Sequence, residues 1–257
     1  MNDSSTDNSL EVASSFQDER IHIYTKENEG VSAARNYGIM HAKYDYIAFL
    51  DADDIWESDY LECQKKLIGT YPDAGIYSTA FYSLEKGKRK LRNVLINEHI
   101  HFLVHDYFKE SVMNGLSICW TSSLCLKKEV IKEIPMFRVG IKRGEDLDLW
   151  LRIALNYDVA YLNLPKVFYR TGLSDSLTSD YSKNGEFPYY EWFNFTSESS
   201  YYRKYVILVV YIHAKNAFIH HDYDTCLAEL WSVKTIAWRF KWAERLLLLV
   251  ISWIKSK

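Results

Sequence analysis

Two hydrophobic periods alternate along the first two thirds of the chain. Short apolar runs predict strands at 21–24, 46–50, 75–82, 122–126 and 159–162. Apolar residues at helical spacing predict helices at 10–16, 31–42, 57–71 and 144–156, and the basic stretch 86–92 is predicted to be a loop. Strands that alternate with helices indicate an α/β sheet.

The pattern changes after about residue 176. A polar, tyrosine-rich link leads to three apolar segments of helical type, at 201–219, 224–238 and 241–254. The first two are predicted to form a helical hairpin. The third is shorter than the roughly 20 apolar residues that a membrane-spanning helix needs. Two interpretations of it stay open, an interfacial helix on a membrane and a helix that docks on protein. We therefore predict a sheet-containing region at 1–176 and a helical region at 177–257, for which membrane association is one interpretation.

Composition narrows the classes of partner. The 257 residues carry a net charge of −3 and are 48% hydrophobic, so the chain can bury a large core and shows no basic surplus for nucleic acid. The four cysteines include no CxxC pair, and the first residues lack a basic and apolar leader pattern. These features predict a cytoplasmic protein without a disulfide framework and without a nucleic-acid partner.

The most specific chemical feature is the acidic segment Asp51-Ala52-Asp53-Asp54, which directly follows the predicted strand at 46–50. Ligands of open α/β sheets bind at the carboxyl ends of strands. Two carboxylates at i and i+2 can reach one hard divalent cation, Mn²⁺ or Mg²⁺, which prefers oxygen ligands. A solvated turn is the competing interpretation of such a short motif.

Four motifs in order resemble glycosyltransferase family 2. The segment from Gly30 to Ile39 resembles its GxSxARNxG helix, and the segment from Tyr46 to Asp54 resembles its YIxFLDxDD strand. Residues 2–7 resemble the DDGSTD nucleotide loop, with Asn2 in place of the first acid. Gly144-Glu145-Asp146 resembles the ED pair, and the segment that begins at Tyr169-Arg170 and runs through Ser174 resembles YRxxxxS.

The resemblance implies the GT-A fold, a Rossmann-like mixed α/β sheet flanked by helices, here with a C-terminal helical extension. It implies that Asp3 and Arg35 contact the nucleotide of a nucleotide-diphospho-sugar, most commonly a UDP-sugar. Asp51 would face the ribose and share Mn²⁺ or Mg²⁺ with Asp53, the principal metal ligand. Asp146 would be the general base, with Glu145 beside it, in an inverting transfer. The implied acceptor is a glycan or a lipid-linked glycan of surface polysaccharide biosynthesis, with peripheral contact to the cytoplasmic face of the membrane.

Each of these residues also has a structural interpretation. Acids that open a helix, such as Glu145 and Asp146, are stabilised by the helix dipole without any catalytic role. Arg35 could pair with Glu27 or Glu29 at the surface, and Asp3 could cap the following helix. Further candidates with structural alternatives are Trp56, which could stack on a sugar or belong to the core, and His99, His101 and His105, whose spacing is a weak metal motif.

The N-terminus departs from the family pattern. The family usually has a strand, a helix and a second strand before the nucleotide loop, whereas this sequence starts inside that loop. We therefore expect an N-terminally truncated chain with weak or absent turnover. Two other hypotheses are kept, an inactive nucleotide-sugar-binding remnant or scaffold, and a nucleotidyltransferase. The second would need a glycine-rich phosphate loop near the N-terminus, and residues 1–30 contain none.

Overall fold

A computed structural model describes residues 1–85, 87–92, 99–115, 117–141, 143–172, 189–192 and 195–232. Its strands are β1 (Tyr46–Ala48), β2 (Ile55–Trp56), β3 (Ile76–Glu85), β4 (Lys88–Arg92), β5 (His101–Val104), β6 (Leu124–Lys127) and β7 (Val159–Thr171). They form one sheet in the order β1-β6-β3-β7-β2, with β4 paired to β3 and β5 paired to β7. Only β3 and β7 are parallel, so the sheet is mixed, as expected.

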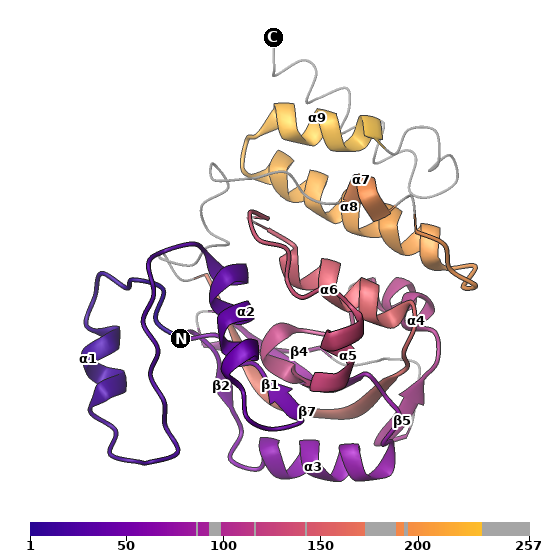
Figure 1. Cartoon of the computed structure of the whole chain (residues 1–257). Helices are drawn as coiled ribbons and strands as arrows, with labels where there is room; N and C mark the ends of the chain where they lie inside the picture. Colours follow the sequence, from indigo (N-terminus) through magenta and orange to yellow (C-terminus); the bar gives the residue numbers. More distant parts are fainter. Residues whose placement is uncertain are drawn as a thin grey trace.

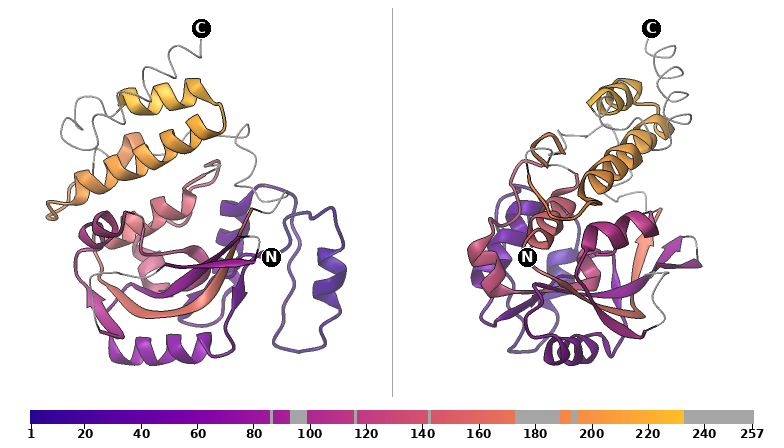
Figure 2. Two further views of the ribbon diagram at one scale, coloured as in Figure 1. Left: turned by 180° about the vertical axis from the view of Figure 1, so that it is seen from behind. Right: turned by 90° about the vertical axis from the view of Figure 1, so that its right-hand side faces the viewer.

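Helices cover both faces of this sheet (Figure 1). The described helices are α1 (Ser9–Ser14), α2 (Val31–His41), α3 (Tyr60–Thr70), α4 (Tyr107–Asn114), α5 (Lys128–Glu133), α6 (Glu145–Ala154), α7 (Tyr189–Trp192), α8 (Tyr202–Ile219) and α9 (Tyr223–Ser232), with a 3-10 turn, η1, at Thr121–Ser123. Helix α1 lies to one side of the sheet (Figure 1) and has no buried residue. The views in Figure 2 place α3 under one face and α2, α5 and α6 over the other, with α8 and α9 stacked beyond them.

The core lies between the sheet and α6. Trp150 and Leu149 on α6 are fully buried, as are Ile76 on β3 and Val159 on β7. The strong amphipathic pattern of α6 explains this, because its apolar stripe needs a sheet face to cover it. Side chains from α8 join the same cluster, and Tyr205 donates or accepts a hydrogen bond at 3.0 Å with the Tyr107 hydroxyl on α4. This buried contact attaches the C-terminal helices to the sheet region.

Two of the predicted elements are wrong. The expected strand at 21–24 does not form, since this stretch has only one bridge beside it, between Asn2 and Thr25. A strand needs a neighbouring backbone along its length, and the described chain supplies only a short contact here. The basic loop at 86–92 contains a strand, β4, which follows a turn at Gly87 (φ +79°) and forms a hairpin with β3. Lysine-rich edge strands of this kind resist unwanted pairing.

The pattern also missed several elements. Helix α4 carries clear end signals, because the Asp106 side chain accepts from the Lys109 backbone N–H and Gly115 ends the helix in the left-handed region. Elements α5, β2 and β5 are too short for a periodic signal. None of the described helices combines the length and the apolar character needed to cross a bilayer. The expected helix at 241–254 lies outside the described residues.

Candidate active site

The acidic segment leaves the sheet at the end of β1. The backbone N–H of Asp51 donates to the Ser122 hydroxyl at 3.0 Å, and the Trp56 indole N–H donates to the Ser122 carbonyl at 2.7 Å. Asp54 N–H donates to the Asp51 carbonyl at 3.0 Å, which closes a turn. Ser122, just before β6, therefore fixes both ends of the segment. Trp56 stacks on Tyr60 and packs against a buried cluster, while it stays partly exposed.

Arg35 connects this segment to the far end of the chain. From α2, its guanidinium donates to the Asp51 carboxylate at 2.8 Å and to the Glu145 carboxylate at 2.7 Å. It also lies over the Phe137 ring, 5.4 Å from the centroid. Burial alone would lower the pKa of Arg35, but the charges of Asp51 and Glu145 outweigh it and raise that pKa. The suggested surface pairing of Arg35 with Glu27 or Glu29 is wrong.

Glu145 and Asp146 open α6 after Gly144, which adopts the left-handed conformation. Burial, together with the neighbouring charge of Asp146, raises the pKa of Glu145 to about 7, against the opposing effect of Arg35. Burial also raises the pKa of Asp146, although Arg35 counteracts this. The Thr121 hydroxyl donates to one Asp146 oxygen at 3.1 Å and the Leu147 N–H to the other at 2.7 Å. The pair therefore holds a proton more readily than ordinary carboxylates do.

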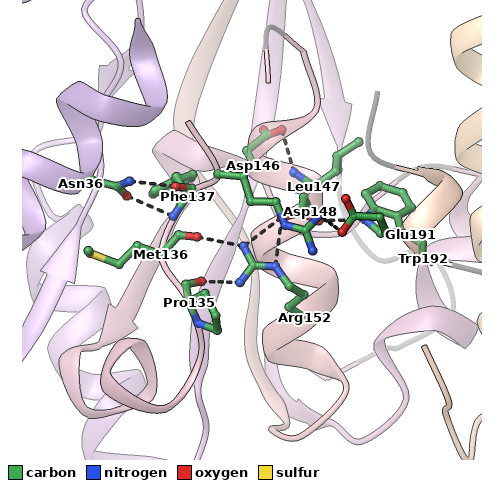
Figure 3. A network of polar contacts seen from close by, with 11 residues as sticks. Asn36, Pro135, Met136, Phe137, Asp146, Leu147, Asp148, Arg152, Glu191 and Trp192 are labelled. Atoms are coloured by element: carbon green, nitrogen blue, oxygen red, sulfur yellow. Dashed lines mark hydrogen bonds and ion pairs between the residues drawn. The ribbon is translucent and has the colours of Figure 1, made fainter. Parts of the chain in front are cut away.

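A polar network holds α6 in place (Figure 3). Asp148, fully buried on α6, accepts from Arg152 at 2.9 Å and from the Trp192 indole at 2.8 Å. Arg152 in turn donates to the carbonyls of Pro135 and Met136. Asp148 lies two residues after Asp146, so this network connects the start of α6 both to α7 and to the 135–137 loop.

The same loop is tied to α2 by Asn36. Its side-chain amide donates to the Phe137 carbonyl at 2.7 Å and accepts from the Phe137 N–H at 3.0 Å. Asn36 follows Arg35 directly, and Phe137 is the ring beneath the Arg35 guanidinium. Arg35, Asn36 and the start of α6 are therefore fixed through one loop, as Figure 3 shows for Asn36 and Phe137.

Asp3 forms hydrogen bonds with a different set of residues from those that bind these carboxylates. Its side chain accepts from Gly30 N–H at 2.8 Å and from Glu29 N–H at 3.2 Å, at the N-terminus of α2, and from Lys26 at 3.0 Å. Burial opposes ionisation, but these donors outweigh it and lower the pKa of Asp3. The cap of the following helix, α1, is Asn8, so the prediction of a cap role for Asp3 is wrong.

Asp53 and Asp54 face different surroundings. Asp54 is buried, one of its oxygens accepts from Arg170 N–H at 3.1 Å, and burial raises its pKa to about 6. The Arg170 guanidinium donates to the Asp53 carbonyl. The Asp53 side chain is partly exposed, and among the described residues it forms no ion pair. Arg170 of β7 therefore contacts the acidic segment through both its backbone N–H and its side chain.

Sequence reasoning found the charged members of this cluster and missed the neutral ones. Thr121 and Ser122 stand in η1, and neither belongs to a motif that distinguishes it from other hydroxyl residues. Asn36 stands within the quoted GxSxARNxG segment, so its position was a usable signal. His101 and His105 have separate partners, since His101 bonds the Tyr71 hydroxyl and His105 pairs with Asp158. Within the described part of the chain, no three His, Cys, Asp or Glu side chains gather closely enough to hold a metal by themselves.

The family model for glycosyl transferase family 2 matches residues 1–134, more than half of the 257 residues. This chain belongs to glycosyl transferase family 2. The match spans the three N-terminal motifs and ends before Glu145 and Asp146. The fold and the Arg35 ion pairs therefore join the acidic segment, which lies inside the matched residues, to Glu145, which lies outside them.

Two relatives of this family 2 chain match it over about 60% of its length. A glycosyltransferase of Rickettsia felis, whose own activity is uncharacterised, is 35% identical over 159 residues, which are 60% of this chain and 24% of the relative. TuaG of Bacillus subtilis, provisionally named as a teichuronic acid biosynthesis glycosyltransferase, is 29% identical over 164 residues, 63% of this chain and 61% of the relative. The match thus spans less than two thirds of the length of either relative.

Solved structures of Staphylococcus aureus TarS share the fold. TarS residues 1–349, in complex with UDP-GlcNAc, superpose with a TM-score of 0.58 at 13% identity, over 97% of this chain and 68% of the TarS chain. The expected GT-A fold, a mixed sheet flanked by helices, is confirmed.

Proposed function

We propose that this chain is an inverting glycosyltransferase that moves a sugar from a nucleotide-diphospho-sugar, most commonly a UDP-sugar, to a glycan or lipid-linked acceptor in surface polysaccharide biosynthesis. The observation that carries the proposal is that Arg35 joins Asp51 to Glu145, so that the acidic segment and the ED pair share one ion-paired cluster. Residues 1–176 would form the catalytic region, and residues 177–257 a helical region. We place the protein in the cytoplasm, with peripheral contact to the membrane.

Asp146 is the group that we assign as general base. Glu145 is held by Arg35, whereas among the described residues Asp146 accepts hydrogen bonds only from a hydroxyl and a backbone N–H. In the proposed step, Asp146 takes the proton of the acceptor hydroxyl, whose oxygen bonds to the anomeric carbon. The bond from that carbon to the diphosphate oxygen breaks, and its electron pair leaves with the nucleotide diphosphate. Attack from the side opposite the leaving group inverts the anomeric configuration.

The donor side is assigned to Asp3, Arg35, Asp51 and Asp53. Asp3 and Arg35 would contact the nucleotide, and Asp51 the ribose. The chain's own role here is to bind and orient, since Arg35 fixes the Asp51 carboxylate and Ser122 fixes its backbone. TarS, which shares this fold, was solved with UDP-GlcNAc, and this supports a nucleotide-diphospho-sugar donor for the present chain.

The acidic segment fits a divalent cation that is shared with a donor diphosphate. Mg²⁺ and Mn²⁺ in such sites need only one or two protein carboxylates, because phosphate oxygens and water complete the coordination. Asp53 offers a partly exposed carboxylate with no ion-pair partner in the described residues, and Asp51 is its neighbour two positions away. Mn²⁺ or Mg²⁺, held by Asp53 and Asp51, would neutralise charge on the leaving diphosphate.

The acceptor class is inferred from chemistry and relatives together. TuaG carries a name that refers to teichuronic acid, and two further relatives are named chondroitin synthase and hyaluronan synthase, both from Pasteurella multocida. These names favour a polysaccharide acceptor.

The competing hypothesis is a chain that binds a nucleotide-sugar without turnover, and it is favoured by α1, which has no buried residue.

The test begins with a thermal shift of the purified chain with UDP, dTDP or GDP, each with and without Mn²⁺. Ligand at about a hundred times its dissociation constant stabilises the folded state by about 2.7 kcal/mol. We expect one nucleotide to raise the melting temperature only with Mn²⁺, and Asp53→Asn to abolish this. Asp146→Asn should keep the shift and lose release of sugar from the donor. A melt that no nucleotide moves would contradict the proposed donor site, and a shift without any turnover in the unaltered chain would favour the binding-only alternative.

A further inference from the structure

A row of apolar side chains crosses four strands beside the candidate active site. The backbone register pairs Leu91 of β4 with Tyr82 of β3, Tyr82 with Phe168 of β7, and Phe168 with Ile55 of β2. Directly paired residues of neighbouring strands lie on the same face of a sheet. Leu91 and Ile55 are 45% and 48% exposed, and the two rings between them are partly exposed. We refer to these four residues as the cross-strand row.

One arginine is held against this row. The Arg89 guanidinium of β4 lies 4.8 Å from the centroid of the Phe168 ring, and the Phe168 ring stacks on Tyr82 with centroids 5.6 Å apart. No carboxylate in the described residues forms an ion pair with Arg89, whose side chain is exposed. The aromatic contact restricts the long side chain, so less conformational entropy is lost when it binds an anion.

The cross-strand row leads directly into the acidic segment. Ile55 follows Asp54 in the chain, and Arg170, two residues after Phe168, bonds the backbone carbonyl of Asp53 and the side chain of Asp54. A ligand that lies along the row therefore has its end at the point where the donor is proposed to bind. The Arg170 guanidinium is bonded to the acidic segment, where its positive charge reduces repulsion of a negatively charged ligand.

From this geometry we propose that the cross-strand row binds the acceptor as a carboxylate-bearing glycan, with sugar rings on the exposed parts of the row and a sugar carboxylate on Arg89. The inference rests on the proposed function, since it names the acceptor of the same transfer. Exposed apolar side chains suit the apolar surfaces of sugars, and the planar guanidinium matches a carboxylate through two hydrogen bonds. A carboxylate attached to the bound sugar ring itself fits, because Arg89 is adjacent to the row.

A membrane surface fits this face less well. Side chains alternate along a strand, so Lys88, Lys90 and Arg92 point to the face opposite Arg89 and Leu91. The cations of β4 are therefore divided between two faces and do not form one broad cationic plane, which binding to anionic lipid would require. A narrow row with one held arginine fits a single extended chain.

The alternation supplies a matched control for the test. Arg89→Gln and Lys90→Gln each remove one positive charge from neighbouring exposed positions, but on opposite faces. The experiment is calorimetric titration of the full chain with oligogalacturonate as the anionic glycan and maltohexaose as the neutral one. We expect oligogalacturonate to bind and Arg89→Gln to weaken it about tenfold, the loss of one charge-assisted pair. Lys90→Gln should change the affinity less than twofold, and Phe168→Ala should weaken binding with the melting temperature checked in parallel.

Equal weakening by both charge variants, equal binding of maltohexaose, or no binding of oligogalacturonate would each overturn the inference. Vesicles of phosphatidylglycerol and phosphatidylcholine that bind with the same dependence on Arg89 would overturn it in favour of a membrane surface. The donor test stays separate. A chain that responds to nucleotide but ignores oligogalacturonate contradicts this inference alone, and a chain that binds oligogalacturonate but no nucleotide contradicts the proposed function alone.

Discussion

The guanidinium of Arg35 lies 2.7 Å from the carboxylate of Glu145, 110 positions further along the chain. Both side chains are largely shielded from water, with 12% and 11% of their surface exposed. The pair joins α2 to α6 across the candidate active site, and Asp51 shares the same guanidinium. Such a contact couples the stability of the fold to the geometry of the site.

Removal of this arginine should therefore destabilise the protein. Arg35→Ala leaves Glu145 and Asp51 without their shared counter-charge, and breaking a buried pair in this way costs about 3 kcal/mol. We expect a clear fall in the free energy of unfolding, measured by urea denaturation. Arg35→Lys should recover only part of the loss, because one ammonium cannot reproduce the planar two-armed contact.

Arg20 is the control, since it pairs with Asp18 at an exposed site. Exposed pairs contribute little, so Arg20→Ala should leave the urea midpoint unchanged. If Arg35→Ala behaved like Arg20→Ala, the buried bridge would have no structural role.

Asp148 should be as sensitive as Arg35, for a different reason. Asp148→Asn keeps the shape but removes the charge that Arg152 and Arg138 share at 2.8 and 3.3 Å. The two arginines then lie close together without their common carboxylate, and we expect a loss of about 3 kcal/mol in the free energy of unfolding. Trp192 fluorescence should also change, because its indole donates to the same carboxylate.

The matched control is Glu129→Gln, which removes the carboxylate of an exposed pair with Lys127. It should change neither the urea midpoint nor the fluorescence. Unaltered emission in Asp148→Asn would show that the α6 to α7 contact does not depend on this charge.

Two glycines should respond to alanine in opposite directions. A Cβ at Gly75 would lie 2.6 Å from the Tyr157 Cβ, so Gly75→Ala must displace the segment after α6 from the start of β3 and should cost about 1–3 kcal/mol. Gly69 lies within α3 with open space around a Cβ, so Gly69→Ala should stabilise by about 0.5–1 kcal/mol through helix propensity. Thermal melts of the two variants test both signs, and a stable Gly75→Ala would contradict the close packing.

The pH dependence of transfer should report the buried acid pair. Burial raises the pKa of both Glu145 and Asp146, that of Glu145 to about 7. A general base must be ionised, so the raised pKa of Asp146 should place the acid limb of the rate above the range of an ordinary aspartate. Thr121→Val removes a hydroxyl that stabilises ionised Asp146, which raises the pKa of Asp146 further and moves the acid limb to higher pH.

Thr70→Val is the control for that shift, because the Thr70 hydroxyl bonds only the Lys66 carbonyl on α3. It should leave the profile unchanged.

The raised pKa of Glu145 also determines how the free energy of unfolding depends on pH. The folded state holds protons that the unfolded chain releases near pH 4.5, so the stabilising contribution is full below that pH and is lost as pH rises towards 7. An acid limb near pH 4 in the unaltered chain would show that neither buried acid is the base.

The sequence by itself determined the longer, strongly patterned elements and the charged residues of the site. Helix α6 has a strong apolar stripe, and the run from Tyr46 into Asp51 marks a buried strand that ends in acids, because both patterns depend on nearby residues. The motifs indicated Arg35, Asp51 and Asp146 as site residues but did not predict which of their side chains contact one another. Local patterns carry this information because helix and strand periods are properties of short segments.

Tertiary structure alone decided the contacts between distant segments. The Arg35 to Glu145 bridge, the Asp148 network and the cross-strand row depend on sheet order and register, which no local period encodes. The two errors have the same origin. Segment 21–24 has strand-like alternation but little backbone beside it, whereas Lys88–Arg92 lacks an apolar pattern and pairs along β3. A strand exists only where a neighbour completes its hydrogen bonds, so its formation is decided by the fold and not by its own residues.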